Sequence, residues 1–148
     1  MWKLNFPAYS FRFKNSENKI RIFDIIRKKF VLLQPEEWVR QHMVHYLLKE
    51  KGYPKSLINV EKQLLVNSIK KRYDIVVFYP NGDIRILVEC KAPDIPITQK
   101  TFDQIARYNL GLNATYLAVT NGMDHFYCKM DRKAEKYHFL EHIPDFSL

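Results

Sequence analysis

Hydrophobic and polar residues alternate over short stretches of this chain, and the alternation predicts strands more often than helices. Stretches rich in Val, Ile, Leu, Phe and Tyr are separated by turn-forming residues, which is typical of β-structure. The pattern predicts strands over residues 11–13, 19–23, 60–67, 73–79, 84–91, 115–120 and 125–129. No internal repeat, low-complexity tract or linker interrupts the pattern.

Two segments with helical signals separate these strands. A helix is predicted from Pro35 to about Lys51, with Glu36 and Glu37 in the first turn, where the helix dipole favours acidic side chains. A second helix is predicted over residues 98–110. The resulting order of strands and helices predicts an α/β fold with a central mixed β-sheet flanked by helices. The sequence contains no glycine-rich phosphate loop of the dinucleotide or Walker type.

Composition and charge narrow the classes of partner. The 148 residues suit one domain, and 47% hydrophobic with 27% charged residues favours folding over disorder. The net charge of +8 favours binding to a polyanion, and nucleic acid is the usual one. Because the sequence shows neither a membrane span nor a signal peptide, we expect a cytoplasmic protein without membrane contact. Cys90 and Cys128 have no metal-ligand spacing, and we expect two reduced thiols, although the sequence is also compatible with a disulfide.

The candidate chemistry lies on the strands that flank Asn81 and Gly82. Asn-Gly between two strand-like segments is a strong hairpin signal, and a two-residue turn there places Asp74 directly opposite Glu89. Opposed residues share a face of the sheet, as do alternate residues along a strand, so Lys91 should share that face. The pairs Ile75 with Val88, Val77 with Ile86, and Tyr79 with Ile84 should then fill the other face, which packs on a core.

Opposed carboxylates repel each other, and a divalent cation would offset the repulsion. Mg²⁺ prefers oxygen ligands and is often held by one or two carboxylates, with water and phosphate oxygens completing its shell. A lysine two residues further along the strand can contact a phosphate or orient an attacking water. The hairpin therefore predicts a metal site at Asp74 and Glu89 with Lys91 beside it, although an ordinary surface pair would explain any one of these residues alone.

The predicted helices carry further candidates for this site. On the second helix, Gln104 and Tyr108 lie one turn apart and Arg107 can reach the same edge, although a polar helix surface explains the spacing equally well. On the first helix, Glu36 and Glu37 are both candidates for a third carboxylate, and Glu37 is preferred. Arg40 follows Glu37 by one turn and is expected to share its face.

Histidines supply no convincing metal site in this sequence. His42 and His45 lie three residues apart on the first helix, and His138 and His142 lie four apart near the end of the chain. Neither pair has a clear third ligand, so we expect amphipathic surface histidines rather than a zinc site.

These residues together resemble a known family. The strings Arg72–Val77 and Val88–Pro93 resemble the core of the PD-(D/E)XK nucleases, and are most similar to the N-terminal nuclease domain of type I restriction enzyme R subunits. The segment Gln104–Asn109 resembles the Q-x-x-x-Y motif that follows this core. Pro35–Gln41 resembles the helix that supplies the early glutamate, and Val119–Gly122 resembles the strand and turn after the motif. The sequence departs from the PD-(D/E)XK pattern at Tyr73, which stands before Asp74 in the position where the pattern has proline.

The resemblance implies a restriction-endonuclease-like core that cleaves DNA phosphodiester bonds with Mg²⁺, which Mn²⁺ can replace. It assigns metal binding to Asp74 and Glu89, catalysis to Lys91, and site support to Glu37, Gln104 and Tyr108. It further implies one domain, with an N-terminal β extension at 1–34, a core at 35–130 and a C-terminal segment at 131–148.

R subunits also carry a helicase motor, whereas this sequence contains no Walker motif. The expected partners are therefore DNA, other restriction-system subunits, and a second copy of the chain if both DNA strands are cut. The alternative is a non-catalytic DNA-binding or assembly module that retains the nuclease fold.

Overall fold

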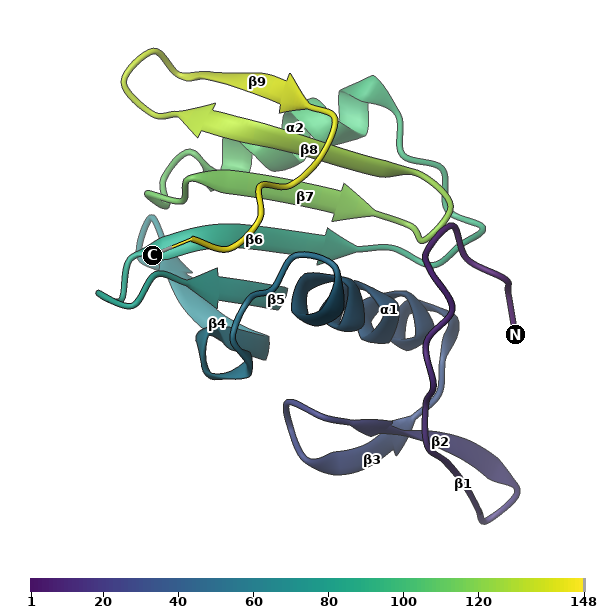
Figure 1. Cartoon of the computed structure of the whole chain (residues 1–148). Coiled ribbons are helices and arrows are strands. Elements are labelled where there is room, and N and C mark those ends of the chain that lie inside the picture. Colours follow the sequence, from purple (N-terminus) through teal and green to yellow (C-terminus); the bar gives the residue numbers. More distant parts are fainter. Residues whose placement is uncertain (148) are drawn as a thin grey trace.

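The computed structural model describes residues 1–147, which form two β-sheets, two α-helices and one short 3-10 helix, η1 (Lys55–Leu57) (Figure 1). The larger sheet has six strands that neighbour one another in chain order: β4 (Ile58–Val66), β5 (Ile69–Phe78), β6 (Ile84–Cys90), β7 (Tyr116–Thr120), β8 (His125–Asp131) and β9 (Lys136–Leu140). β6 and β7 are parallel, and the other neighbours are antiparallel. The predicted α/β fold with a central mixed sheet flanked by helices is therefore confirmed.

The two helices lie on opposite faces of this sheet (Figure 1). α1 (Pro35–Lys49) packs its apolar residues against Ile75, Val77, Ile86 and Val88. α2 (Gln99–Asn109) connects the parallel strands β6 and β7 and packs Phe102 and Ala106 against the other face. Because side chains alternate along a strand, each central strand contributes to both cores.

A smaller sheet lies beside α1 and away from the six-stranded sheet (Figure 1). It consists of β1 (Phe13–Ser16), β2 (Lys19–Asp24) and β3 (Lys29–Leu32), all antiparallel. The sequence predicted β2, placed the first strand at residues 11–13, which overlaps β1 only at Phe13, and missed β3. β3 has only four residues and begins with the last residue of the basic run Arg27–Lys29, so it gives little alternation of apolar and polar residues.

The larger sheet continues beyond residue 130. β9 was not predicted, because its five residues include the polar Lys136 and His138. It forms the edge of the sheet and pairs with one strand only, β8. Ile143, further along the chain, is fully buried in the core beneath α1. The C-terminal segment therefore belongs to the same packed unit as the strands before it.

The expectation of surface histidines on α1 is wrong. His42 and His45 are buried, with 7% and 5% of their surface exposed. The N-terminal arm covers this side of the helix, and the ring of Phe11 lies 4.8 Å from each imidazole, measured between ring centroids. Helical periodicity alone could not show that a distant segment of chain would cover these positions. Both cysteines are free and buried, as expected for thiols.

Candidate active site

The β5–β6 hairpin has the predicted register near its open end but not near its turn. Ile75 pairs with Val88 and Val77 pairs with Ile86, as expected. At the turn, the amide of Tyr79 donates to the carbonyl of Asp83, so the loop contains three residues rather than two. The register shifts by one residue between these regions, and Arg85 is the extra residue of a β-bulge.

The predicted pair of Tyr79 with Ile84 is therefore wrong, because Ile84 pairs with Phe78. The bulge moves Ile84 to the α2 face of the sheet, where it packs with Phe78 on the second core. Since the longer loop and the bulge compensate for each other, the pairs Ile75–Val88 and Val77–Ile86 keep the predicted register, and the ladder ends just before Asp74 and Glu89.

Asp74 lies where the pairing between β5 and β6 ends. One carboxylate oxygen, Oδ2, accepts a hydrogen bond of 2.7 Å from the backbone amide of Cys90, which directly follows Glu89. The other, Oδ1, accepts one of 2.8 Å from the guanidinium of Arg40 on α1. The carboxylate thus fills the position where the strand ladder would otherwise continue, and it links the hairpin to the helix.

Arg40 is the centre of a buried ion-pair network. Its Nη1 lies 2.8 Å from Oε1 of Glu37, and its Nη2 lies 2.8 Å from both Asp74 and Glu61. Burial alone acts to lower the pKa of Arg40, but the Glu37 and Asp74 carboxylates outweigh it and the pKa is raised. Arg40 therefore stays charged and holds acidic side chains from α1, β4 and β5 at one point.

The two glutamates at the start of α1 have different surroundings. Glu37 is buried and its carboxylate is fully engaged, because it accepts hydrogen bonds from Arg27, Arg40 and Gln41. Glu36 is half exposed and faces Asp74: burial and the Asp74 charge raise the pKa of Glu36. The structure thus places Glu36 beside Asp74, whereas it places Glu37 behind Arg40.

Glu61 on β4 also joins this cluster, and the sequence reading missed it. The β4–β5 register is the same on both sides of Glu61, which places it across from Asp74. Its φ of +56° is unusual for a non-glycine residue within a strand and costs on the order of 1 kcal/mol or more. Arg40 at 2.8 Å and Arg72 at 3.3 Å bind its two carboxylate oxygens and hold it in place.

A second cationic side chain neutralises Glu89. The ammonium of Lys71 lies 2.9 Å from Oε1 of Glu89, and only 13% of the Glu89 side chain is exposed. The same ammonium lies 4.8 Å from the ring centroid of Tyr73 and 4.6 Å from that of Tyr108. Burial and the nearby Glu89 charge raise the pKa of Tyr73, so its phenol keeps its proton and donates to Asn109.

Lys91 follows the last residue of β6 and remains aligned with the sheet. Its backbone amide donates a hydrogen bond of 2.8 Å to the carbonyl of Thr120 on β7. Its positive charge partly opposes the rise in the pKa of Glu36, as expected for a cation on the Glu36 side of the site. Among residues 1–147, Lys91 forms no ion pair within 4.0 Å, so its charge remains available to a ligand.

The candidates on α2 do not form one group. Tyr108 reaches the site through Lys71, as described above, and Gln104 is exposed one turn before it. Arg107 instead lines a hollow with Glu135 and Tyr137 at the far edge of the sheet. The structure therefore does not bring Arg107 together with Glu89, because Arg107 is rotated by about 100° around the helix from Tyr108, toward β9.

The carboxylates of Asp74 and Glu89 are the candidate ligands for a metal ion. Within residues 1–147, no group of three or more His, Cys, Asp or Glu side chains is arranged as a complete metal cage. Asp74 and Glu89 nevertheless offer carboxylate oxygens on neighbouring strands, which fits a cation such as Mg²⁺ that keeps water and phosphate oxygens in its shell. Each carboxylate has a cationic partner in the structure, Arg40 or Lys71, that neutralises it.

Comparison with known proteins gives one family. The family model described as "Type I restriction enzyme R protein N terminus (HSDR_N)" matches residues 35–144. A solved structure, the fragment structure of a putative HsdR subunit of a type I restriction enzyme from Vibrio vulnificus YJ016, aligns with 22% identity and a TM-score of 0.43. That alignment covers 69% of this chain and 22% of the other, so this chain spans about a fifth of its length.

No curated protein matches the chain. No helix within residues 1–147 is long and apolar enough to cross a membrane. The family model spans most of the chain and contains Asp74, Glu89, Lys91 and the Gln104–Tyr108 segment within its limits. The chain therefore belongs to the family of type I restriction enzyme R protein N-terminal regions.

Proposed function

We propose that this chain is a metal-dependent DNA endonuclease of the PD-(D/E)XK type. The observation that carries the proposal is the position of Asp74 where the β5–β6 ladder ends, with one carboxylate oxygen bound to the amide of Cys90, the residue between Glu89 and Lys91. Asp74 and Glu89 are the residues that would hold Mg²⁺ or Mn²⁺. A cation bound there supplies Lewis acidity that polarises the phosphate and lowers the pKa of an attacking water.

The other side chains have roles that follow from their contacts. Lys91, unpaired within the described chain, binds the scissile phosphate or orients the water, and its fixed charge stabilises the transition state. Arg40 is a positioning residue, because it holds Asp74 against α1 at 2.8 Å. Glu36 is the helix carboxylate of the site in preference to Glu37, which is occupied by Arg27 and Arg40.

Two residues of α2 support Glu89 in this proposal. Tyr108 packs its ring against the Lys71 ammonium that pairs with Glu89, and Gln104 lies one turn before it, on the exposed side of α2. DNA is the substrate, and the net charge of +8 favours its binding. Other restriction-system subunits would supply the translocating motor, and a second copy of the chain would supply the second active site for double-strand cleavage.

One observation favours a different function. Asp74 and Glu89 are neutralised by Arg40 and Lys71, so the fold does not need a metal to offset their repulsion. In a non-catalytic DNA-binding or assembly module, these two ion pairs would be sufficient to keep the carboxylates stable in the fold. A catalytic site would need the ion pairs to open or to tolerate a cation beside them.

Cleavage of supercoiled plasmid separates these two functions. The wild-type chain should convert supercoiled DNA to the open circle with Mg²⁺ or Mn²⁺ and not with a chelator. Asp74→Asn should abolish this conversion, whereas Asp83→Asn, in the exposed loop of the same hairpin, should leave it unchanged. A wild-type chain that binds plasmid but never nicks it with either metal would overturn the enzyme proposal in favour of the module.

A further inference from the structure

We propose that the outer face of the N-terminal sheet β1–β3 is a binding surface for the sugar–phosphate backbone of duplex DNA. Side chains alternate between the two faces of a strand. On β2, Ile22 and Asp24 are fully buried and mark the inner face. Lys19, Arg21 and Phe23 therefore belong to the outer face.

The strand pairing extends this face across the sheet. Lys14 of β1 pairs with Arg21 of β2, and Phe23 pairs with Phe30 of β3. The residue before β1, Arg12, joins the same row, because its carbonyl accepts a hydrogen bond from the amide of Phe23. The outer face thus carries four cationic side chains next to two aromatic rings.

Aromatic rings hold two of these cations in place. The Arg12 guanidinium lies 4.5 Å from the ring centroid of Phe23 and 5.6 Å from that of Phe30. The Lys14 ammonium lies 5.8 Å from the Phe30 ring. Arg12 and Lys14 are both exposed, so the rings orient the charges without removing them from solvent.

These charges are not neutralised by the protein. The two acidic residues of the segment lie elsewhere: Asp24 faces inward and pairs with Arg27, and Glu17 is in the β1–β2 turn. None of the four outer cations forms an ion pair within the described residues, in contrast to Arg27, Arg40 and Lys71. An unpaired cationic face is complementary to a row of phosphates, and arginine and lysine are the usual donors to them.

Buried ion pairs connect this sheet to the candidate active site. Arg27, between β2 and β3, lies 2.5 Å from Asp24 and 2.8 Å from Glu37. Glu37 lies 2.8 Å from Arg40, which in turn lies 2.8 Å from Asp74. DNA held on the outer face would therefore have a defined position relative to Asp74. The inference rests on the proposed function in one respect, namely that DNA is the polyanion.

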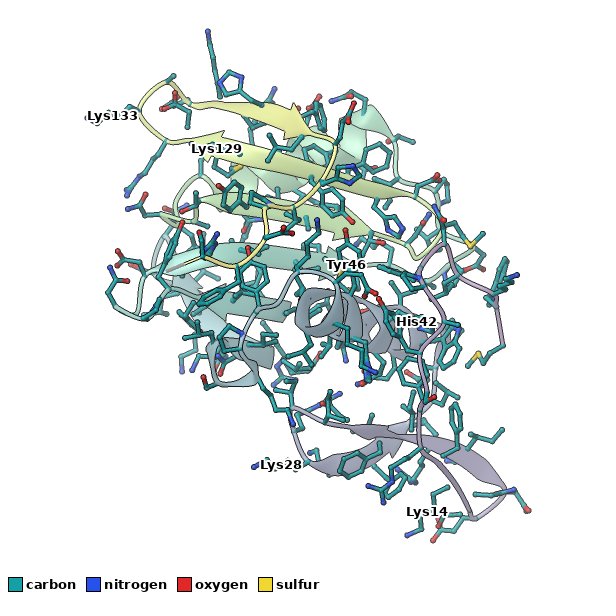
Figure 2. All side chains as sticks on the ribbon, viewed as in Figure 1. Lys14, Lys28, His42, Tyr46, Lys129 and Lys133 are labelled. Atoms are coloured by element: carbon teal, nitrogen blue, oxygen red, sulfur yellow. The ribbon has the colours of Figure 1, made fainter. Side chains whose placement is uncertain are left out.

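The test is the salt dependence of duplex DNA binding, measured by fluorescence anisotropy in the presence of a chelator so that no cleavage occurs. The triple variant Lys14→Gln/Lys19→Gln/Arg21→Gln removes three outer cations. The matched control Lys129→Gln/Lys133→Gln/Lys136→Gln removes the same charge around the β8–β9 turn, at the opposite end of the molecule (Figure 2).

Each lost phosphate contact reduces the slope of log affinity against log salt by about 0.9. The outer-face variant should therefore lose about 2.7 from the slope and bind at least tenfold more weakly at low salt. The control should keep most of the wild-type slope. Equal losses in both variants would show a dependence on net charge alone and would overturn the proposal, as would an unchanged slope in the outer-face variant.

Two further measurements separate a folding defect from a loss of DNA binding, and DNA from another polyanion. Should the triple variant fail to fold, the double variant Lys14→Gln/Lys19→Gln changes only exposed side chains and should lose about 1.8 from the slope. Competition with poly-L-glutamate separates DNA from an acidic protein partner, and equal competition at equal charge would overturn the assignment to DNA. Because the assay needs no metal, failure of the plasmid-nicking test would leave its outcome unaffected.

Discussion

Replacing Arg40 by methionine tests whether the buried ion-pair network holds the candidate site together. The substitution keeps an unbranched apolar stem and removes the guanidinium, leaving three carboxylates without their shared partner: Glu37, Asp74 and Glu61. Arg40 is 7% exposed, so solvent cannot readily replace the lost charge. Removing one partner of a buried ion pair typically costs about 3–5 kcal/mol.

That cost is a large share of the stability of a domain, which is about 5–15 kcal/mol. For a chain of this size, 1 kcal/mol corresponds to about 2–4 °C in the thermal midpoint, so Arg40→Met should lower the midpoint by about 6–20 °C. Thermal unfolding followed by circular dichroism measures this, with urea unfolding as a check that the transition stays two-state.

Arg72→Met is the matched control. Arg72 also pairs with Glu61, at 3.3 Å, but 66% of its side chain is exposed. An exposed pair contributes about 0–1 kcal/mol, so the midpoint should hardly move. Equal midpoints for Arg40→Met and Arg72→Met, or an Arg40→Met midpoint within a few degrees of wild type, would refute the claim that Arg40 organises the site.

Val88→Ala should cost about 2 kcal/mol through a cavity beneath α1, whereas Leu65→Ala on the exposed side of β4 should change unfolding by less than about 0.5 kcal/mol, as urea titration would show. Burial, with the charges of Lys49 and His42, lowers the pKa of His45 from 6.5 to about 4. Only the unfolded state binds this proton between those values, so stability should fall by roughly 1–3 kcal/mol as the pH falls through that window, and His45→Phe should flatten the dependence. Mn²⁺ should raise the thermal midpoint of the wild type and leave that of Asp74→Ala unchanged, and equal shifts would contradict metal binding at Asp74.

The register of the β5–β6 hairpin was predicted correctly around Ile75 because two errors cancelled, one in the length of the loop and one in the missed bulge. Asn81 and Gly82 signal a tight turn, and the alternation of apolar residues then aligns the strands. Sequence patterns do not reveal a bulge, so the three-residue loop and the extra residue Arg85 were both missed. The pairing of Ile75 with Val88 was nevertheless correct, since the burial of one face determines the register there.

Glu61 shows what the same reasoning could have found. Asn67 and Ser68 form a two-residue turn in which both residues have positive φ, the conformation that favours hairpins. Taking them as the turn places Glu61 opposite Asp74, as observed. The signal is weaker than Asn-Gly because serine seldom adopts positive φ, so the pattern did not indicate a tight hairpin.

The distinction between Glu36 and Glu37 could not be predicted at all. The two residues are adjacent on one helix turn, and periodicity allows either to face the sheet. Arg27 decides between them, because it reaches from the β2–β3 connection to bind Glu37. Such a contact depends on how two separate elements pack, which local sequence does not encode.

Lys91 is proposed to act on DNA without being needed for folding, and one paired measurement on Lys91→Ala tests both parts. Plasmid-nicking rate and thermal midpoint are determined together, with Lys70→Ala, on the exposed part of β5, as control. Lys91→Ala should lower the nicking rate by about a hundredfold or more, as for loss of one preorganised charge. Its stability should change by less than about 1 kcal/mol. A variant that nicks DNA at the wild-type rate, or one that unfolds, would contradict the role assigned to Lys91.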